Sequence, residues 1–284
     1  MKNIEAAIVA DSVNPDETRI TSFLLTYPRL IHSELMTHRV FSRNAASSRA
    51  IPISKMIAAV RSNPATFEQW GSNGKGMQAK GILGPDAEEA AKSAWSTGKL
   101  RAIETAETLH ALGAHKQIAN RVLEPWLRIS VLVTATDYDN FFALRAHKDA
   151  QPEFQVLAFK MLNQYLKNKP KELPWGHWHA PLVQNGWTNY EGGLIESVAN
   201  CARVSYTKHD GEFGIHEQRK LVDALALGGH WSPFEHQAQA VKNGSRFGNF
   251  APGWMQYRKK FLNENRKQVD LQKLLDEKPD WVQL

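Results

Sequence analysis

The chain has 284 residues, of which 42% are apolar and 23% are charged, a composition typical of a globular protein with a core of its own. No apolar run approaches the roughly 20 residues of a membrane-spanning helix, the first residues lack the apolar stretch of a secretory signal, and the single cysteine excludes an internal disulfide. We therefore expect a cytoplasmic protein without membrane association. The formal net charge of +6 favours anionic partners such as phosphates, although a generically basic surface would have the same charge.

The N-terminal part predicts one strand, two short helices and a loop. Residues 19–27 are rich in β-branched and aromatic side chains, which is typical of a strand. Apolar residues at helical spacing predict a helix from Pro28 to about His38, and a second helix is expected over residues 52–62. The glycine-rich stretch 70–84 lacks the Gly-Lys-Ser/Thr ending of a phosphate-binding loop, so we interpret it as a mobile surface loop.

Helices dominate the rest of the chain. Pro85 begins a long helix that Gly113 would cap, and residues 126–136 predict a second strand. Further helices are expected over residues 114–124, 137–147 (with Asp137 as cap), 152–169, 190–202 and 214–227. The remaining segments are a connection rich in proline and tryptophan, 169–186, and a charged peripheral tail, 265–284. Because helices outnumber strands without regular alternation, we predict an α+β fold with a single catalytic domain over residues 1–284.

A basic stretch that also carries several hydroxyl groups follows the helix predicted from Pro28 to about His38. Residues 38–49 hold a histidine, three arginines and three serines within twelve positions. The guanidinium fork of arginine fits phosphate oxygens, and Ser47 and Ser48 can add hydroxyl and amide donors. A solvated basic loop with helix caps would have a similar composition, so this pattern alone leaves both interpretations open.

Two later stretches also hold polar side chains that could take part in catalysis or ligand binding. In residues 140–153, Arg145 lies near a helix end, where it could serve a site or only complement the helix dipole. In residues 229–236, two histidines and a glutamate flank Pro233, which prevents a regular helix, and their spacing matches no zinc pattern, so no metal is expected. His177 and His179 alternate without a third ligand, and we interpret both as surface or capping histidines.

Together these stretches resemble the flavin-dependent thymidylate synthases. The family signature Arg-His-Arg-x-x-Ser-x-Asn-Glu-x-Ser-x-Arg-Tyr is similar to Thr37-His38-Arg39-Val40-Phe41-Ser42-Arg43-Asn44-Ala45-Ala46-Ser47-Ser48-Arg49-Ala50. The other similar stretches are the set Asn140, Arg145, Gln151 and Glu153, the stretch Ala202–Tyr206, and the stretch His230–His236. Each match alone is weak, but four of them spread over the chain are specific.

The order of these stretches differs from the usual family order. The last two precede the signature in common family members, whereas here they follow it by more than 150 residues. The resemblance therefore implies a circularly permuted form of the family fold, a mixed or antiparallel sheet packed with helices. We expect residues 202–236 to pack beside the strand at 19–27 and the helix at 29–38.

The resemblance also implies an activity, cofactors and an assembly. Family members transfer a methylene group from methylenetetrahydrofolate to C5 of dUMP and reduce it with FADH2, which NADPH regenerates. They are homotetramers with sites shared between subunits and bind neither nucleic acid nor membranes as partners. Carried over by position, Arg145 would be the catalytic residue that holds the uracil edge, with Ser47, Ser48, Arg49 and Arg121 on the phosphate. The FAD-binding residues would be His38, Arg39, Asn140 and Ser232.

Three signature positions depart from the family pattern and leave the substrate open. Thr37, Ala45 and Ala50 stand where the family has Arg, Glu and Tyr. A site that hydrogen-bonds a base rejects the wrong donor and acceptor pattern strongly, so we hypothesise dUMP or a related pyrimidine nucleotide such as dCMP. Cys201 has no activating context, which argues against the cysteine chemistry of flavin-free thymidylate synthases. The alternatives are a flavin- or nucleotide-binding protein without turnover and a nucleic-acid-binding module.

Overall fold

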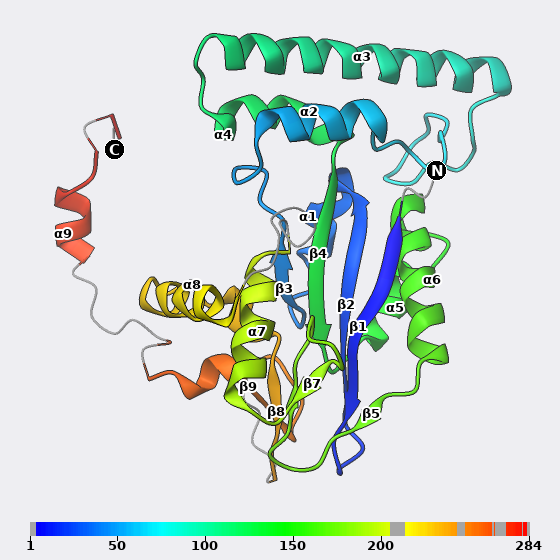
Figure 1. Cartoon of the computed structure of the whole chain (residues 1–284). Coiled ribbons are helices and arrows are strands. Elements are labelled where there is room, and N and C mark those ends of the chain that lie inside the picture. Colours follow the sequence, from blue (N-terminus) through cyan, green and yellow to red (C-terminus); the bar gives the residue numbers. More distant parts are fainter. Residues whose placement is uncertain are drawn as a thin grey trace.

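The computed structural model shows an α+β fold, as predicted, built around a five-stranded main sheet (Figure 1). The residues described are 4–204, 214–242, 248–262, 264, 271–279 and 281–282. The strand order is β3-β4-β2-β1-β5, and every pair is antiparallel except β1 with β5. The strands are β1 (Glu5–Val13), β2 (Arg19–Pro28), β3 (Ser42–Ala45), β4 (Arg128–Ala135) and β5 (Lys171–Glu172).

The central strands bury one apolar face against two helices. Phe23, Leu25 and Tyr27 alternate along β2, so their side chains share one face of the sheet and are fully buried. This face packs with α5 (Asp139–Arg145) and α6 (Pro152–Lys167), whose buried residues include Phe141 and Phe154. The helix predicted from Pro28 to about His38 is shorter than expected. In its place the chain forms the 3-10 helix η1 (Arg29–Ile31) and the single helical turn α1 (His32–Leu35).

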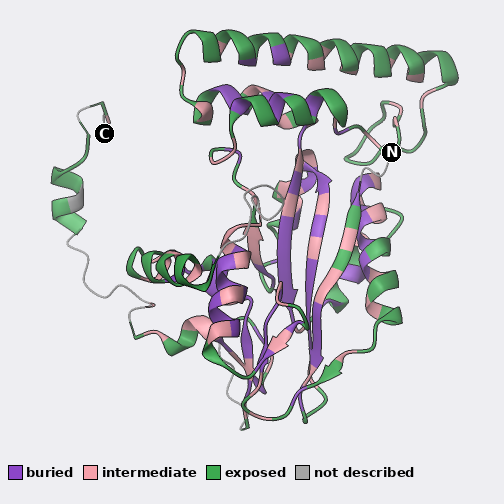
Figure 2. Ribbon diagram, viewed as in Figure 1, coloured by how far each residue is buried: buried purple, intermediate pink, exposed green. Residues whose placement is uncertain are grey.

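A helical layer lies across one end of the main sheet (Figure 1). It contains α2 (Ile53–Ser62), α3 (Pro85–Ala111), α4 (Lys116–Ala119) and the 3-10 helix η2 (Asn120–Trp126). Gly113 follows α3 with φ of +83°, the left-handed conformation of the predicted cap. The helix predicted over 114–124 becomes α4 plus η2, because Pro125 lacks the amide that a continuous α-helix needs. Most of α3 is exposed (Figure 2).

A second, four-stranded sheet lies beside the first and comes from the C-terminal half of the chain. Its order is β7-β6-β8-β9, and its strands are too short for a sequence pattern to predict. The strands are β6 (Trp178–His179), β7 (Trp187–Thr188), β8 (Ala238–Ala240) and β9 (Trp254–Gln256). The accompanying helices are α7 (Glu191–Ala202), α8 (Ile215–Leu227), η3 (Ser232–Glu235), η4 (Tyr257–Lys260) and the exposed α9 (Leu271–Asp276) of the tail. Within the described ranges, no helix combines the length and the hydropathy that crossing a bilayer requires.

The C-terminal part packs against the main sheet, as the permutation predicts. Residues of η3 contact β3, where the Ser232 hydroxyl donates to Asn44 Oδ1 at 3.1 Å. The His236 ring is hydrogen-bonded to Thr134 of β4 at 2.9 Å. These contacts involve β3 and β4, and β4 pairs directly with β2, the strand predicted at 19–27. Ser205 and Tyr206 of the matching stretch lie outside the described residues.

Buried hydrogen bonds connect the two sheets through a line of hydroxyl groups. His179 is fully buried, with Nδ1 at 2.9 Å from Ser12 Oγ and Nε2 at 2.8 Å from Ser22 Oγ. Ser22 Oγ is 2.6 Å from Thr134 Oγ1, which also contacts the His236 ring. The prediction of a surface or capping histidine at position 179 is therefore wrong: the sheet pairing encloses the ring and gives both nitrogens a hydroxyl partner.

This histidine pair predicts loss of stability in acid. Burial lowers the pKa of His236 to about 3, and burial together with the neighbouring His236 lowers the pKa of His179 to about 3. Because unfolded histidine binds its proton near pH 6.5, the unfolded state takes up more protons as the pH falls from 6.5 towards 3. The free energy of unfolding should be highest above pH 6.5 and fall by about 1.4 kcal/mol per pH unit for each histidine. Urea titrations from pH 7.5 to 4.5 measure how the free energy of unfolding changes with pH, and the variant H236Q should show a smaller slope. A free energy of unfolding that does not change over this range would contradict the prediction.

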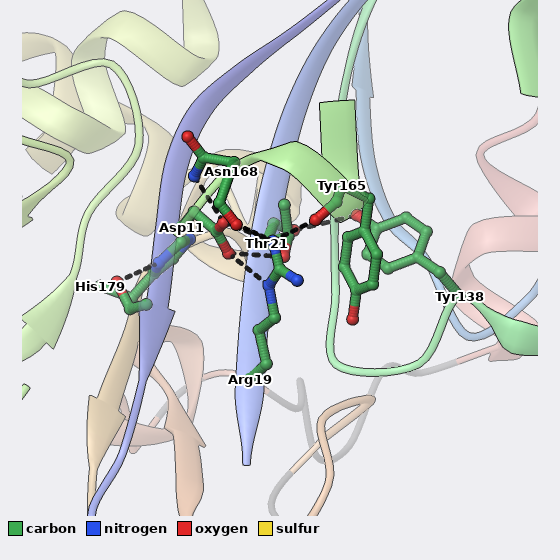
Figure 3. Close-up of polar contacts among 8 residues, drawn as sticks. Asp11, Arg19, Thr21, Tyr138, Tyr165, Asn168 and His179 are labelled. Carbon is green, nitrogen blue, oxygen red and sulfur yellow. Dashed lines mark hydrogen bonds and ion pairs between the residues drawn. The ribbon is translucent and has the colours of Figure 1, made fainter. Parts of the chain in front are cut away.

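A buried carboxylate joins the ends of β1 and β2 to the end of α6 (Figure 3). Asp11 accepts two hydrogen bonds from Arg19, at 2.9 Å and 2.6 Å, one from the Thr21 hydroxyl at 2.8 Å, and one from the Asn168 amide at 2.6 Å. The Arg19 guanidinium lies over the Tyr165 ring at 3.8 Å. The carboxylate is thus fully hydrogen-bonded, as burial of a charge requires.

Replacing Asp11 with alanine should destabilise the fold by about 2 kcal/mol, less than a fully buried pair would lose because Arg19 remains partly exposed. The loss arises because four donor groups, on Arg19, Thr21 and Asn168, lose this acceptor. Chemical denaturation measures the effect. E104A, which removes the exposed partner of Arg101, is the matched control and should leave the stability close to unchanged; an equal effect in both variants would contradict the prediction.

Candidate functional site

The predicted catalytic residue, Arg145, lies at the end of α5 and is held by two acceptors. Its Nε donates to His38 Nε2 at 3.0 Å, and its Nη1 donates to Glu34 Oε2 at 2.9 Å. The guanidinium also lies over the Phe154 ring at 4.8 Å. We call Glu34, His38 and Arg145 the base cluster. Two side chains of one segment, more than 100 residues before Arg145 in the sequence, thus hold its guanidinium in a single orientation.

His38 is an enclosed, neutral partner of this arginine. Its ring is buried, stacks on Phe41 and meets Phe141 edge-on. Burial, together with the positive charges of Arg145 and Arg43, lowers the pKa of His38 to about 4. Since Nε2 accepts the bond from Arg145, the proton of the neutral ring lies on Nδ1. The ring therefore orients Arg145 rather than offering a free group to a ligand.

A cavity of about 800 Å³ lies next to the base cluster. Glu34 and Arg145 form part of its wall, and Gln151 and Glu153 of the matching stretch form another part. Gln151 donates to Glu153 Oε2 at 2.8 Å, and the buried Glu153 also accepts from the Glu68 amide at 2.7 Å. The volume is within the range of small-ligand sites.

The glycine-rich loop contributes to this cavity. Gly71, Gln78 and Lys80 lie along its wall, and Gln78 donates to the Asp149 carbonyl at 2.6 Å. The sequence prediction was a surface loop without a part in a site. Its exposure is confirmed, but its tertiary position brings it to the same cavity as Arg145.

A second cluster contains residues predicted to bind phosphate, and a carboxylate lies among them. Arg121 Nη1 donates to Glu124 Oε1 at 2.8 Å, and Arg29 Nη2 lies 3.1 Å from the same oxygen. The Ser48 hydroxyl donates to it at 3.4 Å, while Ser47 and Arg49 are exposed on the same segment. We call Arg29, Ser48, Arg121 and Glu124 the anion cluster. Three donors converge on one point, which a carboxylate of the chain itself occupies.

The residues predicted to bind FAD have different environments. Arg39 and Asn140 are exposed and offer donor groups, and the exposed Ser232 hydroxyl lies against Asn44. Such donors fit the pyrophosphate and amide groups of a dinucleotide. His38 does not fit a direct contact, because its ring is enclosed and its Nε2 is already bonded to Arg145.

Sequence reasoning missed Glu34, Arg29 and Glu124. Glu34 lies four residues before His38, a spacing that places two helical side chains on one face, and this signal could have found it. Glu124 follows Arg121 by three residues and could have been paired with it in the same way. The sequence carries no comparable signal for Arg29, which reaches Glu124 only through tertiary packing.

Thiol and metal chemistry find no support in the part of the chain that the structure covers. Cys201 is fully buried, and burial raises the pKa of its thiol, which disfavours the thiolate that a nucleophile requires. Among the described residues, no three His, Cys, Asp or Glu side chains converge as metal ligands would.

Comparison with known proteins identifies the family. The model of the family described as Thy1, thymidylate synthase complementing protein, matches residues 11–171, which is more than half of the chain. No curated protein sequence gives a significant match.

Two similar solved structures are of a UMP/dUMP methylase, PolB, from Streptomyces cacaoi. The structure bound with 5-Br dUMP has a TM-score of 0.48 and 18% identity, covering 58% of this chain and 90% of that one. The structure bound with 5-Br UMP has a TM-score of 0.46 and 20% identity, covering 58% and 89%. Likeness at this level assigns no individual residue, whereas the family match extends over both the signature segment and Arg145. The chain therefore belongs to the Thy1 family of thymidylate synthase complementing proteins.

Proposed function

We propose that the protein is a flavin-dependent enzyme that methylates C5 of a pyrimidine deoxynucleotide, dUMP or dCMP, with methylenetetrahydrofolate as carbon donor and NADPH as reductant. Family membership supports the reaction class, and the PolB methylase among the similar structures acts on UMP and dUMP. The observation that carries the proposal is Arg145, held by His38 and Glu34 at the wall of a cavity of ligand size.

Arg145 has the geometry to polarise a pyrimidine. A guanidinium held by two acceptors keeps further N–H groups for a ligand, and these would donate to a carbonyl oxygen of the base and, where ring N3 carries no proton, to N3. Such donors stabilise negative charge on the ring while C5 attacks an electrophilic carbon, so no enzyme nucleophile is needed. Because His38 is neutral, it holds the guanidinium without adding a second positive charge.

The proposed flavin site uses Arg39, Asn140 and Ser232 as exposed donors, with His38 acting only through Arg145. The chemistry that the bound cofactor supplies is reduction of the transferred one-carbon group. The anion cluster and the base cluster do not line the same cavity within one chain. We therefore propose that a neighbouring subunit supplies Ser47, Ser48, Arg49 and Arg121 to the base cluster, as in the homotetramer that the family resemblance implies.

The test is incubation of the purified protein with each nucleotide, methylenetetrahydrofolate, FAD and NADPH, followed by mass spectrometry of the nucleotide. We expect one added methyl group on dUMP or dCMP and flavin absorbance in the purified protein. Flavin absorbance without product from either nucleotide would contradict the proposal and indicate a binding protein without turnover. Salt-sensitive binding to oligonucleotides in place of nucleotides would indicate a nucleic-acid-binding module.

A further inference from the structure

Two polar side chains of β3 hold the C-terminal part of the chain against the signature segment. Residues two positions apart in a strand point to the same face, so Ser42 and Asn44 lie together on β3. Ser42 Oγ accepts from Gln256 Nε2 at 3.0 Å, and Asn44 is hydrogen-bonded to both α7 and η3. Asn44 thus joins the signature to two residues that follow it by 157 and 188 positions.

The orientation of the Asn44 amide follows from its partner on α7. The Cys201 carbonyl is one of the last four of this helix, which have no acceptor role within it, and it accepts from Asn44 Nδ2. A carbonyl can only accept, so the amide nitrogen must face it and Oδ1 must face the other way. That amide oxygen accepts from the Ser232 hydroxyl at 3.1 Å.

This bond determines which hydrogen-bonding groups Ser232 keeps for a ligand. Ser232 is exposed at the start of η3, and the buried side chains of Pro233 and Phe234 anchor this turn. A serine hydroxyl has one proton, and Asn44 accepts it, so the oxygen keeps only its lone pairs for other partners. A ligand must therefore bring an N–H or O–H group to Ser232.

We propose that Asn44 is a positioning residue of the flavin site, which fixes Ser232 as an acceptor for an N–H or O–H group of FAD. FAD carries such groups on both of its ring systems and on its sugar hydroxyls. This inference rests on the proposed function, which assigns Ser232 to FAD, and it refines the part of Ser232 from donor to acceptor. Asn44 acts on the cofactor only through the serine.

The test is a double-mutant cycle on FAD affinity, in which the full-length variants N44A, S232A and N44A/S232A are titrated with FAD and followed by flavin fluorescence. We expect S232A to weaken binding by about tenfold, the scale of one lost hydrogen bond. N44A should weaken it by about fivefold, because the serine hydroxyl can then rotate and offer its proton instead. The double variant should lose about tenfold, the same as S232A alone, because Asn44 has no effect without the serine hydroxyl.

Two further variants separate positioning from loss of structure. S232T is the conservative replacement, since threonine keeps the hydroxyl, and it should bind FAD within about twofold of the wild type. Thr136→Val is the matched control: Thr136 Oγ1 accepts from the Ala251 amide at 2.8 Å, so this bond also ties the C-terminal part to the main sheet but involves no residue of η3. T136V should keep the FAD affinity within about twofold, whatever its effect on thermal unfolding.

These readouts distinguish the inference from the proposed function. Losses that add to about 50-fold in the double variant, wild-type affinity in S232A, or a loss in T136V equal to that in N44A would overturn the inference, while binding of FAD would leave the proposed function standing. Non-additive losses without methylation of dUMP or dCMP would support the inference and defeat the proposed reaction. A wild type that does not bind FAD would overturn both.

Discussion

Replacing Arg145 with alanine is expected to lower kcat/KM for nucleotide methylation by about 1000-fold, the scale on which a preorganised charge donor acts. The guanidinium is the group that would stabilise negative charge on the pyrimidine ring, and His38 and Glu34 fix its orientation before the nucleotide binds. The loss should lie mainly in kcat, because the interaction strengthens as charge develops on the base.

Arg145→Lys serves as the conservative comparison for this prediction. Lysine keeps the positive charge but cannot donate in one plane to His38, Glu34 and a base at once, so we expect a loss of about 100-fold. Steady-state kinetics with the methylated nucleotide as readout measures both variants, and thermal unfolding checks that each folds. Activity of the alanine variant within tenfold of the wild type would show that Arg145 does not hold the base.

Substitutions in the anion cluster should change nucleotide affinity in opposite directions. Arg121→Ala removes a donor and is expected to weaken binding of the nucleotide by about 100-fold, as loss of a charged hydrogen bond to phosphate does. Glu124→Gln removes the carboxylate that Arg121, Arg29 and Ser48 now contact, and is expected to strengthen binding by about tenfold. The reason is that a phosphate group must displace this carboxylate or share the donors with it.

The deoxynucleoside without its phosphate is the control for both variants. Calorimetry should show the opposite changes for the nucleotide and no change for the nucleoside, because only the phosphate competes with Glu124. Equal effects on nucleoside and nucleotide, or weaker nucleotide binding in E124Q, would show that the anion cluster is not the phosphate site.

Long elements and their types could be predicted because their patterns are local. The strand at 19–27 appears as β2, the strand at 126–136 as β4, and the helices begun by Pro85 and Pro152 as α3 and α6, because β-branched runs, helical spacing and N-terminal prolines act within a few residues. The sequence also determined the family, since four short stretches carry the resemblance whatever their order along the chain.

The tertiary structure alone decided how these stretches meet. The short strands β5 to β9 have no period of their own and form because neighbouring strands satisfy their amides. His179 looks like a surface histidine in sequence, yet sheet pairing buries it between two serines. The bond between Glu34 and Arg145 spans 111 residues, so the group that orients this guanidinium arises from packing that no local pattern encodes.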